Sequence, residues 1–400
     1  MTQSIFDKFQ YYANLREDVA RLDTNPFNVV VEQVLSETEA IVNGRRTILA
    51  GTNNYLGLTF DPRCIAAGRK ALEEEGTGTT GSRMANGTYA GHLALERELA
   101  DFFGLPSSIV FSTGYIANLG ILSTIPGPSD VVLLDADSHA SIYDGCRLGS
   151  AEVIRFRHND PGDLDKRLKR LGTKAESALI VVEGIYSMIG DQAPLQEIVE
   201  VKRRHGAYLL VDEAHSLGVL GEHGRGLVEQ AGVQEDVDFI VGTFSKSLGA
   251  IGGFCVSKWK ELENVRYAMR PYIFTASSSP SIIASTRVAL HILREQGAEL
   301  RKRLWDNAHR LYLGLRELDF KLGPESSPVV AITLGESKEQ ALEIWHDLLD
   351  KGVYVNLVMP PASPGAGCLL RCSLSSAHSA VQIDAIIDAF RSLRNNILES

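Results

Sequence analysis

Lys246 lies in the turn Gly242–Ser247, which is built from small and hydroxyl residues and directly follows an apolar, strand-like stretch. A lysine in such a turn can bind a phosphate group. It can also form an imine with an aldehyde, provided that desolvation lowers the pKa of its amine. The G-x-x-x-x-G-K-[ST] spacing of a P-loop is absent. The turn by itself therefore leaves both chemistries open.

Asp212 ends a second apolar stretch, Tyr208–Asp212, and His215 follows three residues later. A carboxylate at the end of a buried strand is unfavourable unless a cation or a hydrogen-bond donor pairs with it. Asp212 is therefore either the partner of a cationic group on a ligand or the cap of a helix. His215 is close enough in sequence to reach the same ligand.

Thr113-Gly114-Tyr115 follows a predicted strand that ends at Phe111 and precedes the helix-like stretch Ile116–Thr124. The free N–H groups at the start of a helix suit a phosphate, and Gly114 permits its close approach. Turns of this composition are common, however, so an ordinary turn is the alternative.

His139 lies just after another predicted strand, in the segment Asp135–Ser141. Asp135, Asp137 and His139 could bind a metal ion, but the sequence offers no convincing further ligands. The alternative is that the flat imidazole stacks on a flat cofactor ring. We expect no metal.

These residues have to be positioned by an α/β fold. Apolar strands alternate with helix-like segments such as Leu195–His205, which predicts a mostly parallel seven-stranded sheet covered on both faces. In such a sheet ligands bind outside the carboxyl ends of the strands, where the residues above are found. The predicted strands are Ser108–Phe111, Val131–Asp135, Val153–Phe156, Ala178–Glu183, Tyr208–Asp212, Phe239–Thr243 and Gly253–Ser257.

Three segments are expected along the chain. Residues 1–50 form an N-terminal helix and a hairpin around Asn43-Gly44, and residues 51–285 form the large cofactor-binding domain. Residues 286–400 form a smaller α/β domain with antiparallel strands near Val329–Leu334 and Cys368–Ser373. Its helices are expected at Ser281–Leu318, Lys338–Lys351 and Ala380–Asn395.

Composition excludes several classes of function. The 400-residue chain has a formal net charge of −10 and no basic block, which argues against binding nucleic acid. Its N-terminus lacks the apolar core of a signal peptide, and no apolar run approaches the roughly 20 residues of a transmembrane segment. The five cysteines lack zinc-ribbon spacing and fit a reducing compartment. We therefore expect a cytoplasmic enzyme.

Taken together, the candidate residues are those that a pyridoxal 5'-phosphate site needs. Lys246 would form the imine, and Asp212 would pair with the protonated pyridine nitrogen, which keeps the ring an electron sink. His215 would bond the ring hydroxyl, and His139 would stack on the ring. The phosphate would be held by Gly114, Tyr115, Thr243 and Ser245.

The chain resembles the α-oxoamine synthases, a branch of the fold-type I pyridoxal-phosphate transferases, from about Asn25 to Arg394. The resemblance rests on motifs in a fixed order: NNYLG (53–57), GTGTTGSRMANGTYAGHLALE (76–96), FSTGYIAN (111–118), DADSHASIYDG (135–145), EGIYSMIGDQAPL (183–195), VDEAHSLGVLG (211–221), GTFSKS (242–247) and LLRCSL (369–374). Within the family, GTFSKS, GSRMANGT (81–88) and RPYIFTAS (270–277) look most like the bacterial members that use L-serine.

The resemblance implies a condensation of L-serine with a palmitoyl thioester, which gives 3-ketodihydrosphingosine, CO₂ and the free thiol carrier. The carrier can be coenzyme A or acyl carrier protein. The resemblance further implies a homodimer with shared active sites, in which Thr275 and Ser277 reach the phosphate of the partner's cofactor. Asn54 would line the substrate pocket, Arg371 would clamp the serine carboxylate, and Lys246 would be the base.

One position departs from the family pattern. Some serine-using members have an arginine directly before the Pro-Pro of the segment that reads Val358-Met359-Pro360-Pro361 here. Met359 cannot bind a carboxylate, so Arg371 acts alone or the amino-acid substrate differs. The alternatives are a sister synthase that uses glycine or alanine, and a non-catalytic paralogue. The latter would be expected to lack the lysine.

Overall fold

The computed structural model describes residues 4–20, 24–360, 362–363 and 367–398. The chain forms two compact units. The large unit comprises residues 53–187 and 191–304, and the small unit comprises residues 1–52, 188–190 and 305–400. The boundary between residues 304 and 305 falls inside the longest helix, α11 (Pro280–Arg316). The division into domains at residues 1–50, 51–285 and 286–400 remains a prediction.

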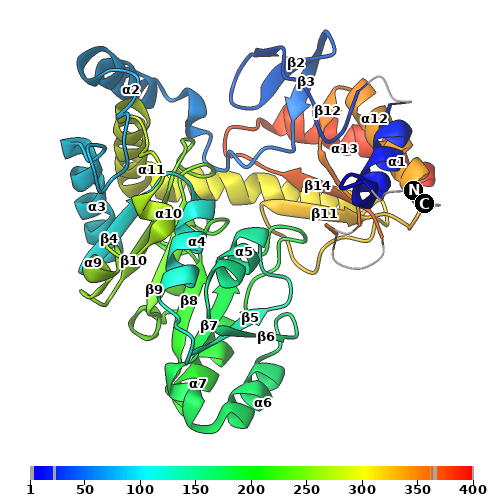
Figure 1. Cartoon of the computed structure of the whole chain (residues 1–400). Helices are drawn as coiled ribbons and strands as arrows, with labels where there is room; N and C mark the ends of the chain where they lie inside the picture. Colours follow the sequence, from blue (N-terminus) through cyan, green and yellow to red (C-terminus); the bar gives the residue numbers. More distant parts are fainter. Residues whose placement is uncertain (1–3, 21–23, 361, 364–366, 399–400) are drawn as a thin grey trace. The chain divides into compact units, whose positions relative to one another are not determined.

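The large unit is built on a seven-stranded sheet in the order β4-β10-β9-β8-β7-β5-β6 (Figure 1). Only β10 is antiparallel to its neighbours, so the carboxyl ends of the other strands share one edge. This arrangement confirms the predicted fold class. The strands are β4 (Ser107–Phe111), β5 (Val131–Asp135), β6 (Glu152–Phe156), β7 (Leu179–Glu183), β8 (Tyr208–Asp212), β9 (Phe239–Thr243) and β10 (Gly253–Ser257).

Helices follow most of these strands, as the alternating pattern predicted. The helices α4 and α5 pack against each other, and so do α6 and α7 (Figure 1). The helices of this unit before α11 are α2 (Pro62–Glu75), α3 (Ala90–Phe103), α4 (Gly114–Thr124), α5 (Ala140–Leu148), α6 (Pro161–Leu171), α7 (Leu195–His205), α8 (Leu227–Gln230), α9 (Leu262–Val265) and α10 (Arg270–Ile273), with 3₁₀ turns at Leu58–Phe60, Gly172–Ser177 and Gln234–Asp236.

Both faces of the large sheet are buried. In β7, successive side chains point to opposite faces, yet Ile180, Val181 and Val182 are all fully buried. One face packs on α4 and α5 through a cluster that includes Ile121 and Ile142. A strand buried on both sides needs apolar residues at every position, which explains why these strands read as continuous apolar runs.

The small unit contains two sheets, in the orders β1-β2-β3-β12 and β11-β14-β13. The second is antiparallel, as predicted. The Asn43-Gly44 hairpin is present, and both residues have positive φ, of 50° and 69°, as a type I′ turn requires. The elements are α1 (Gln10–Val19), β1 (Gln33–Val34), β2 (Glu39–Val42), β3 (Arg45–Leu49), β11 (Val329–Thr333), α12 (Lys338–Asp350), β12 (Val353–Tyr354), β13 (Asn356–Val358), β14 (Leu369–Ser373), α13 (Ala380–Ser392) and α14 (Arg394–Leu398), with a 3₁₀ turn at Asp7–Phe9.

All five cysteines are buried and present as free thiols. Across the described ranges, no helix combines the length and the apolar character needed to cross a membrane.

A buried carboxylate fastens α8 to the large sheet. Glu213 follows β8 and accepts hydrogen bonds from the N–H groups of Leu227 and Val228, at 2.9 and 2.8 Å, and from the hydroxyl of Ser216. Burial raises the pKa of Glu213 to about 7, against the opposing effect of these hydrogen bonds. Part of the protein's stability must therefore depend on pH.

We expect the free energy of unfolding to fall as the pH rises from about 4.5, the ordinary pKa of glutamate, to about 7. In this window the native state keeps a proton on Glu213 that the unfolded chain releases. Glu213→Gln cannot titrate and should flatten this part of the profile. Denaturant unfolding of both proteins at pH 5, 6, 7 and 8 measures the difference. Equal slopes would contradict the assignment.

Candidate active site

A cavity of about 250 Å³ lies at the carboxyl edge of the large sheet. It is smaller than a site for a drug-sized ligand and suits a single substituted ring. Most of the sequence-predicted site residues meet there, although their roles stay predictions. The cavity is lined by Thr113, Gly114, Tyr115, Asn118, His139, Ser141, Glu183, Asp212, Ala214, His215, Thr243, Ser245 and Lys246.

The start of helix α4 forms one wall. Thr113 caps the helix, and its hydroxyl accepts the N–H of Ile116 at 3.0 Å. A Cβ on Gly114 would lie 2.9 Å from the Cβ of Thr243, so only glycine lets the helix start so close to the end of β9. The N–H groups of Gly114 and Tyr115 belong to the first turn, which has no acceptors within the helix. They are placed to bind an anion.

A chain of hydrogen bonds connects Asp212 to His139. One amide group, that of Asn118, donates to Asp212 at 2.7 Å and to the hydroxyl of Ser141 at 2.9 Å. The Ser141 hydroxyl lies 2.8 Å from Nδ1 of His139. The other oxygen of Asp212 accepts the N–H of Ala214 at 2.9 Å. Asp212 is thus held as a hydrogen-bonded, buried carboxylate.

The imidazole of His139 is uncharged near neutral pH. Burial lowers its pKa, and the positive charge of Lys246 lowers it further, while Asp212 opposes both. Its Nδ1 accepts the backbone N–H of Ser141 at 3.2 Å, so the proton of the neutral ring is on Nε2. A neutral, oriented ring at the cavity wall is what stacking on a cofactor requires.

The far side of the cavity carries His215 and the lysine turn. Nδ1 of His215 lies 2.7 Å from the hydroxyl of Tyr55, which fixes the ring. In the turn, the hydroxyls of Thr243 and Ser245 lie 2.8 Å apart, and Thr243 also donates to the carbonyl of Gly252 at 2.9 Å. Lys246 directly follows these residues and lines the cavity.

Three polar side chains of the site were not identified from the sequence. Asn118 and Ser141 lie inside helices, and Glu183 was read only as a strand end. Glu183 is buried and accepts the backbone N–H of His139. Burial and the neighbouring Asp212 raise its pKa well above the ordinary value, although the His139 N–H and Lys246 oppose them. A polar residue in an otherwise apolar helix was the available signal for Asn118.

The structure gives Asp135 a partner other than a metal ion. Its carboxylate lies 2.8 Å from Nδ1 of His158 and accepts the N–H of Asp137 at 2.9 Å. His139 points its Nδ1 at Ser141 instead. Within the described ranges, no group of three or more His, Cys, Asp or Glu side chains is arranged to hold a metal.

The remaining predicted residues do not line this cavity. Ser277 bonds Thr79 and the carbonyl of Gly87, both at 2.7 Å, and Thr275 lies close by in the same segment of the large unit. Asn54 is buried and donates to Thr59 at 2.8 Å. Arg371 belongs to β14 of the small unit, where its guanidinium lies 3.4 Å from the side-chain oxygen of Asn356.

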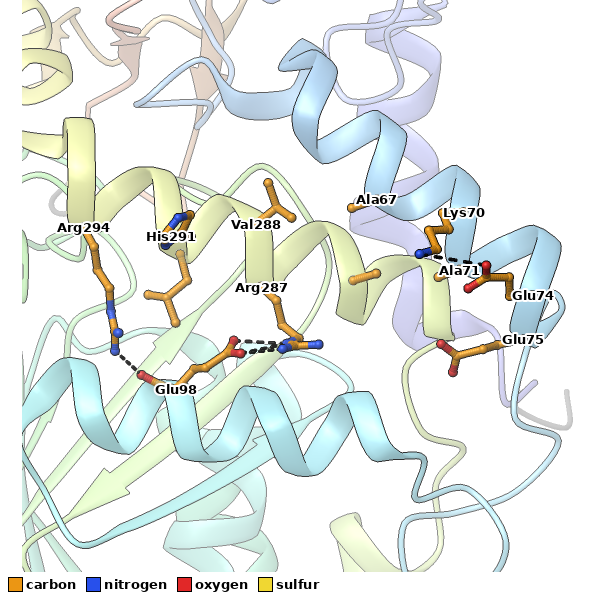
Figure 2. A pocket seen from close by; sticks show the side chains of 12 residues that line it. Ala67, Lys70, Ala71, Glu74, Glu75, Glu98, Arg287, Val288, His291 and Arg294 are labelled. Carbon is orange, nitrogen blue, oxygen red and sulfur yellow. Dashed lines mark hydrogen bonds and ion pairs between the residues drawn. The ribbon is translucent and has the colours of Figure 1, made fainter.

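Figure 2 shows a larger groove of about 540 Å³ between α2, α3 and α11. Its charged side chains largely satisfy one another. Arg287 pairs with Glu98 at 2.6 Å, and Arg294 donates to the Glu98 carbonyl at the same distance. None of the predicted site residues lines this groove, so we place the chemistry in the smaller cavity.

The residues of the smaller cavity fit pyridoxal phosphate. Asp212 is a buried carboxylate that can face a protonated ring nitrogen, and the neutral imidazole of His139 can cover a ring face. The helix start at Gly114, together with the hydroxyl of Ser245, offers donors to a phosphate. Lys246 supplies an amine at the same cavity.

Comparison with known proteins agrees with this assignment. Residues 46–390 match the model of the aminotransferase class I and II family. The chain is 59% identical to the serine palmitoyltransferase of Caulobacter vibrioides, over 96% of this chain and 95% of that protein. It is 54% identical to the serine palmitoyltransferase of Sphingomonas paucimobilis, over 92% and 87% of the two chains. The chain belongs to the serine palmitoyltransferase family.

Solved structures of serine palmitoyltransferases are also close to this chain. A high-resolution structure with a pyridoxal-phosphate internal aldimine has a TM-score of 0.95 and 51% identity, and covers 98% of this chain and 99% of that one. A variant from S. paucimobilis with a bound pyridoxal-phosphate–myriocin aldimine has a TM-score of 0.96. The 8-amino-7-oxononanoate synthase of Lysinibacillus sphaericus is less similar, at 37% identity over 90% of this chain and 91% of that protein.

We expect Asn118→Ala to raise the dissociation constant of pyridoxal phosphate about tenfold or more. The substitution removes a hydrogen bond to a charged group, which contributes about 1.5–3 kcal/mol, and releases Ser141 as well. Absorbance titration of the apoprotein measures the effect. Ser141→Ala is the control, because it leaves the bond between Asn118 and Asp212 intact and should weaken binding less. Equal effects of the two variants would contradict the role given to Asn118.

Proposed function

We propose that this chain catalyses the decarboxylating condensation of L-serine with a palmitoyl or similar long-chain acyl thioester. The products are 3-ketodihydrosphingosine, CO₂ and the free thiol, and the reaction is the first step of sphingolipid synthesis. The observation that carries the proposal is the meeting of Lys246, Asp212, His139 and His215 at one cavity. The family supports the choice of substrates.

Pyridoxal phosphate, when bound, supplies an aldehyde and an electron-withdrawing ring to this chemistry. Lys246, which lines the cavity, would hold the cofactor through this aldehyde. Asp212 would face the protonated ring nitrogen, and the hydrogen bonds from Asn118 and Ala214 hold its carboxylate in place. His215, whose ring Tyr55 orients, would donate to the ring hydroxyl of the cofactor.

With serine bound, the amine of Lys246 takes the proton from Cα of serine as general base. Cα then bonds to the acyl carbonyl carbon and the C–S bond breaks, so the carrier leaves as a thiolate that takes a proton from water. The bond between Cα and the carboxylate breaks next, and the protonated Lys246 returns its proton to Cα as CO₂ departs. His139 covers the reacting centre and, through Nε2–H, holds the serine carboxylate until that step.

Four further features belong to the proposal. Arg371 clamps the serine carboxylate, because a guanidinium fork matches carboxylate geometry. Asn54 lines the pocket of serine and acyl chain. Thr275 and Ser277 reach the phosphate of the partner's cofactor in a homodimer with shared sites. The reaction takes place in the cytoplasm, in keeping with five cysteines that are all free thiols.

The test is to incubate the purified protein with pyridoxal phosphate, palmitoyl-CoA or palmitoyl acyl carrier protein, and serine, glycine or alanine separately. Mass spectrometry of the lipid should detect 3-ketodihydrosphingosine with serine alone. Lys246→Ala should bind the cofactor without covalent attachment, give no borohydride-trapped adduct and lose about 10³-fold or more of the turnover. Light scattering of the same sample should give the mass of a homodimer.

Two outcomes would overturn parts of this proposal. A product formed from glycine or alanine instead of serine would move the chain to a sister activity with the same cofactor. A trapped adduct on Lys246→Ala would refute the assignment of the lysine.

Arg371 and Met359 distinguish two ways of binding the amino-acid carboxylate. Both side chains are buried in the small unit, but only the guanidinium can pair with an anion. Pro361, at the end of the same segment, lies outside the described residues. We expect Arg371→Ala to raise KM for serine about tenfold or more, since a charge-assisted hydrogen bond contributes about 1.5–3 kcal/mol.

Met359→Ala is the matched control and should change KM for serine less than about twofold, because a thioether makes no bond to a carboxylate. Circular dichroism checks that both variants fold. Equal, small effects of the two substitutions would eliminate Arg371 as the clamp.

A further inference from the structure

His158 lies outside the cavity and plays no part in the proposed chemistry, yet both of its ring nitrogens contact carboxylates. Nδ1 lies 2.8 Å from Asp135, and Nε2 lies 2.7 Å from Asp191. A third carboxylate, that of Asp137, lies 3.9 Å from Nδ1. The ring of Tyr186 packs edge to face against the imidazole, with the two ring centroids 4.5 Å apart. These groups surround a single imidazole in the large unit.

The contacts determine the charge of the ring. An ionised carboxylate only accepts hydrogen bonds, and a neutral imidazole has only one N–H to donate. Two carboxylates on opposite sides therefore require the imidazolium form. Burial alone would lower the pKa of His158, but the hydrogen bonds with Asp135 and Asp191 outweigh it and raise the pKa to about 10. His158 is thus a cation that joins two anions at neutral pH.

One of these anions shapes the segment that carries His139. Asp135 ends β5, and its carboxylate accepts the N–H of Asp137 at 2.9 Å, which turns the chain out of the strand. The segment is held further by a bond from the Ala136 N–H to the carbonyl of Phe156 at 3.0 Å. His139 comes next, and its N–H donates to Glu183. The orientation of Asp135 therefore sets where the helix start at His139 lies.

The other anion anchors the clamp on a different part of the chain. Asp191 lies between β7 and α7, and it also accepts the side-chain amide of Asn159 at 2.8 Å. The backbone N–H of Asn159 donates to the second oxygen of Asp135 at 2.9 Å, and its φ of 51° is left-handed. Two consecutive residues, His158 and Asn159, thus each bridge Asp135 and Asp191. Both bridges stop the Asp135 carboxylate from rotating.

We propose that His158 is a positioning residue of the active site: it clamps Asp135 to Asp191 and so holds the 136–141 segment that presents His139 to the substrate. The kinetic part of this inference rests on the proposed function. The structural part concerns only the order of the 136–141 segment and does not depend on the reaction.

The test substitutes His158→Gln, which is uncharged and donates from one nitrogen only, so it cannot replace the two opposed N–H groups of the imidazolium. In the holoenzyme, we expect the backbone amides of residues 136–141 to exchange hydrogen at least tenfold faster than in the wild type. The value of kcat/KM for serine should fall about tenfold or more, while the cofactor absorbance on Lys246 is retained. Loss of a charged hydrogen bond of this kind is large enough for both effects.

His205→Gln is the matched control. His205 lies in the same unit, is similarly buried and bonds Asp165 at 2.9 Å, but it has no connection to the 136–141 segment. This variant should leave exchange of residues 136–141 and kcat/KM within twofold of the wild type. If the two histidine variants have equal effects, His158 only stabilises the fold and the inference fails.

A double-mutant cycle with His139→Ala separates positioning from general stability. If His158 acts through His139, adding His158→Gln to His139→Ala should lower kcat/KM by less than twofold. A full multiplicative loss in the double variant would overturn the inference. Should His158→Gln not fold, Asp191→Asn removes one end of the clamp and should give smaller changes in the same direction. Unchanged exchange at 136–141 in that variant would also overturn it.

The two proposals fail in distinguishable ways. If the wild type forms no product from serine, the proposed function is wrong, and hydrogen exchange in His158→Gln and His205→Gln still decides the role of His158. If the wild type condenses serine but residues 136–141 exchange normally in His158→Gln, only the clamp is wrong.

Discussion

Three carboxylates end adjacent parallel strands, and this concentration of buried negative charge is the constraint on which the site depends. Asp135, Glu183 and Asp212 end β5, β7 and β8, and Glu183 and Asp212 are direct neighbours in register. Like charges this close in a poorly solvated place cannot all be ionised without compensation. The structure compensates each one differently. Asp212 receives neutral donors, Asp135 receives a cationic histidine, and the pKa of Glu183 rises so that protonation is favoured.

The three solutions suit three tasks. In the proposed function Asp212 pairs with a protonated ring nitrogen, and neutral N–H donors hold this carboxylate without cancelling its charge. Asp135 has no ligand to meet, so a full positive charge can neutralise it and fix its orientation. Glu183 accepts the N–H of His139 from the other side. The segment between Asp135 and His139 is therefore held at both of its ends by groups on other strands and loops.

Much of this could be predicted from the sequence, because continuous apolar runs and the polar residues that end them are local signals. Four strands have the predicted bounds, for example Tyr208–Asp212, and the others differ by a residue at one end. Asn118 was not predicted, because its role depends on a hydrogen bond to Asp212, which is 94 residues away in the sequence. His158 was missed for the same reason, since neither of its partners follows from helix or strand periodicity.

The small unit contains a strand pairing that local sequence patterns cannot predict. Strand β3 near the N-terminus pairs in parallel with β12, through Ile48 and Val353, and Ser373 bonds the carbonyl of Ala50 at 2.7 Å. This pairing could not be predicted, because nothing in residues 45–49 identifies a partner some 300 residues later. The entropic cost of closing a loop grows only with the logarithm of its length. Such a pairing therefore needs no local signal, and only the register of side chains that become buried together selects it.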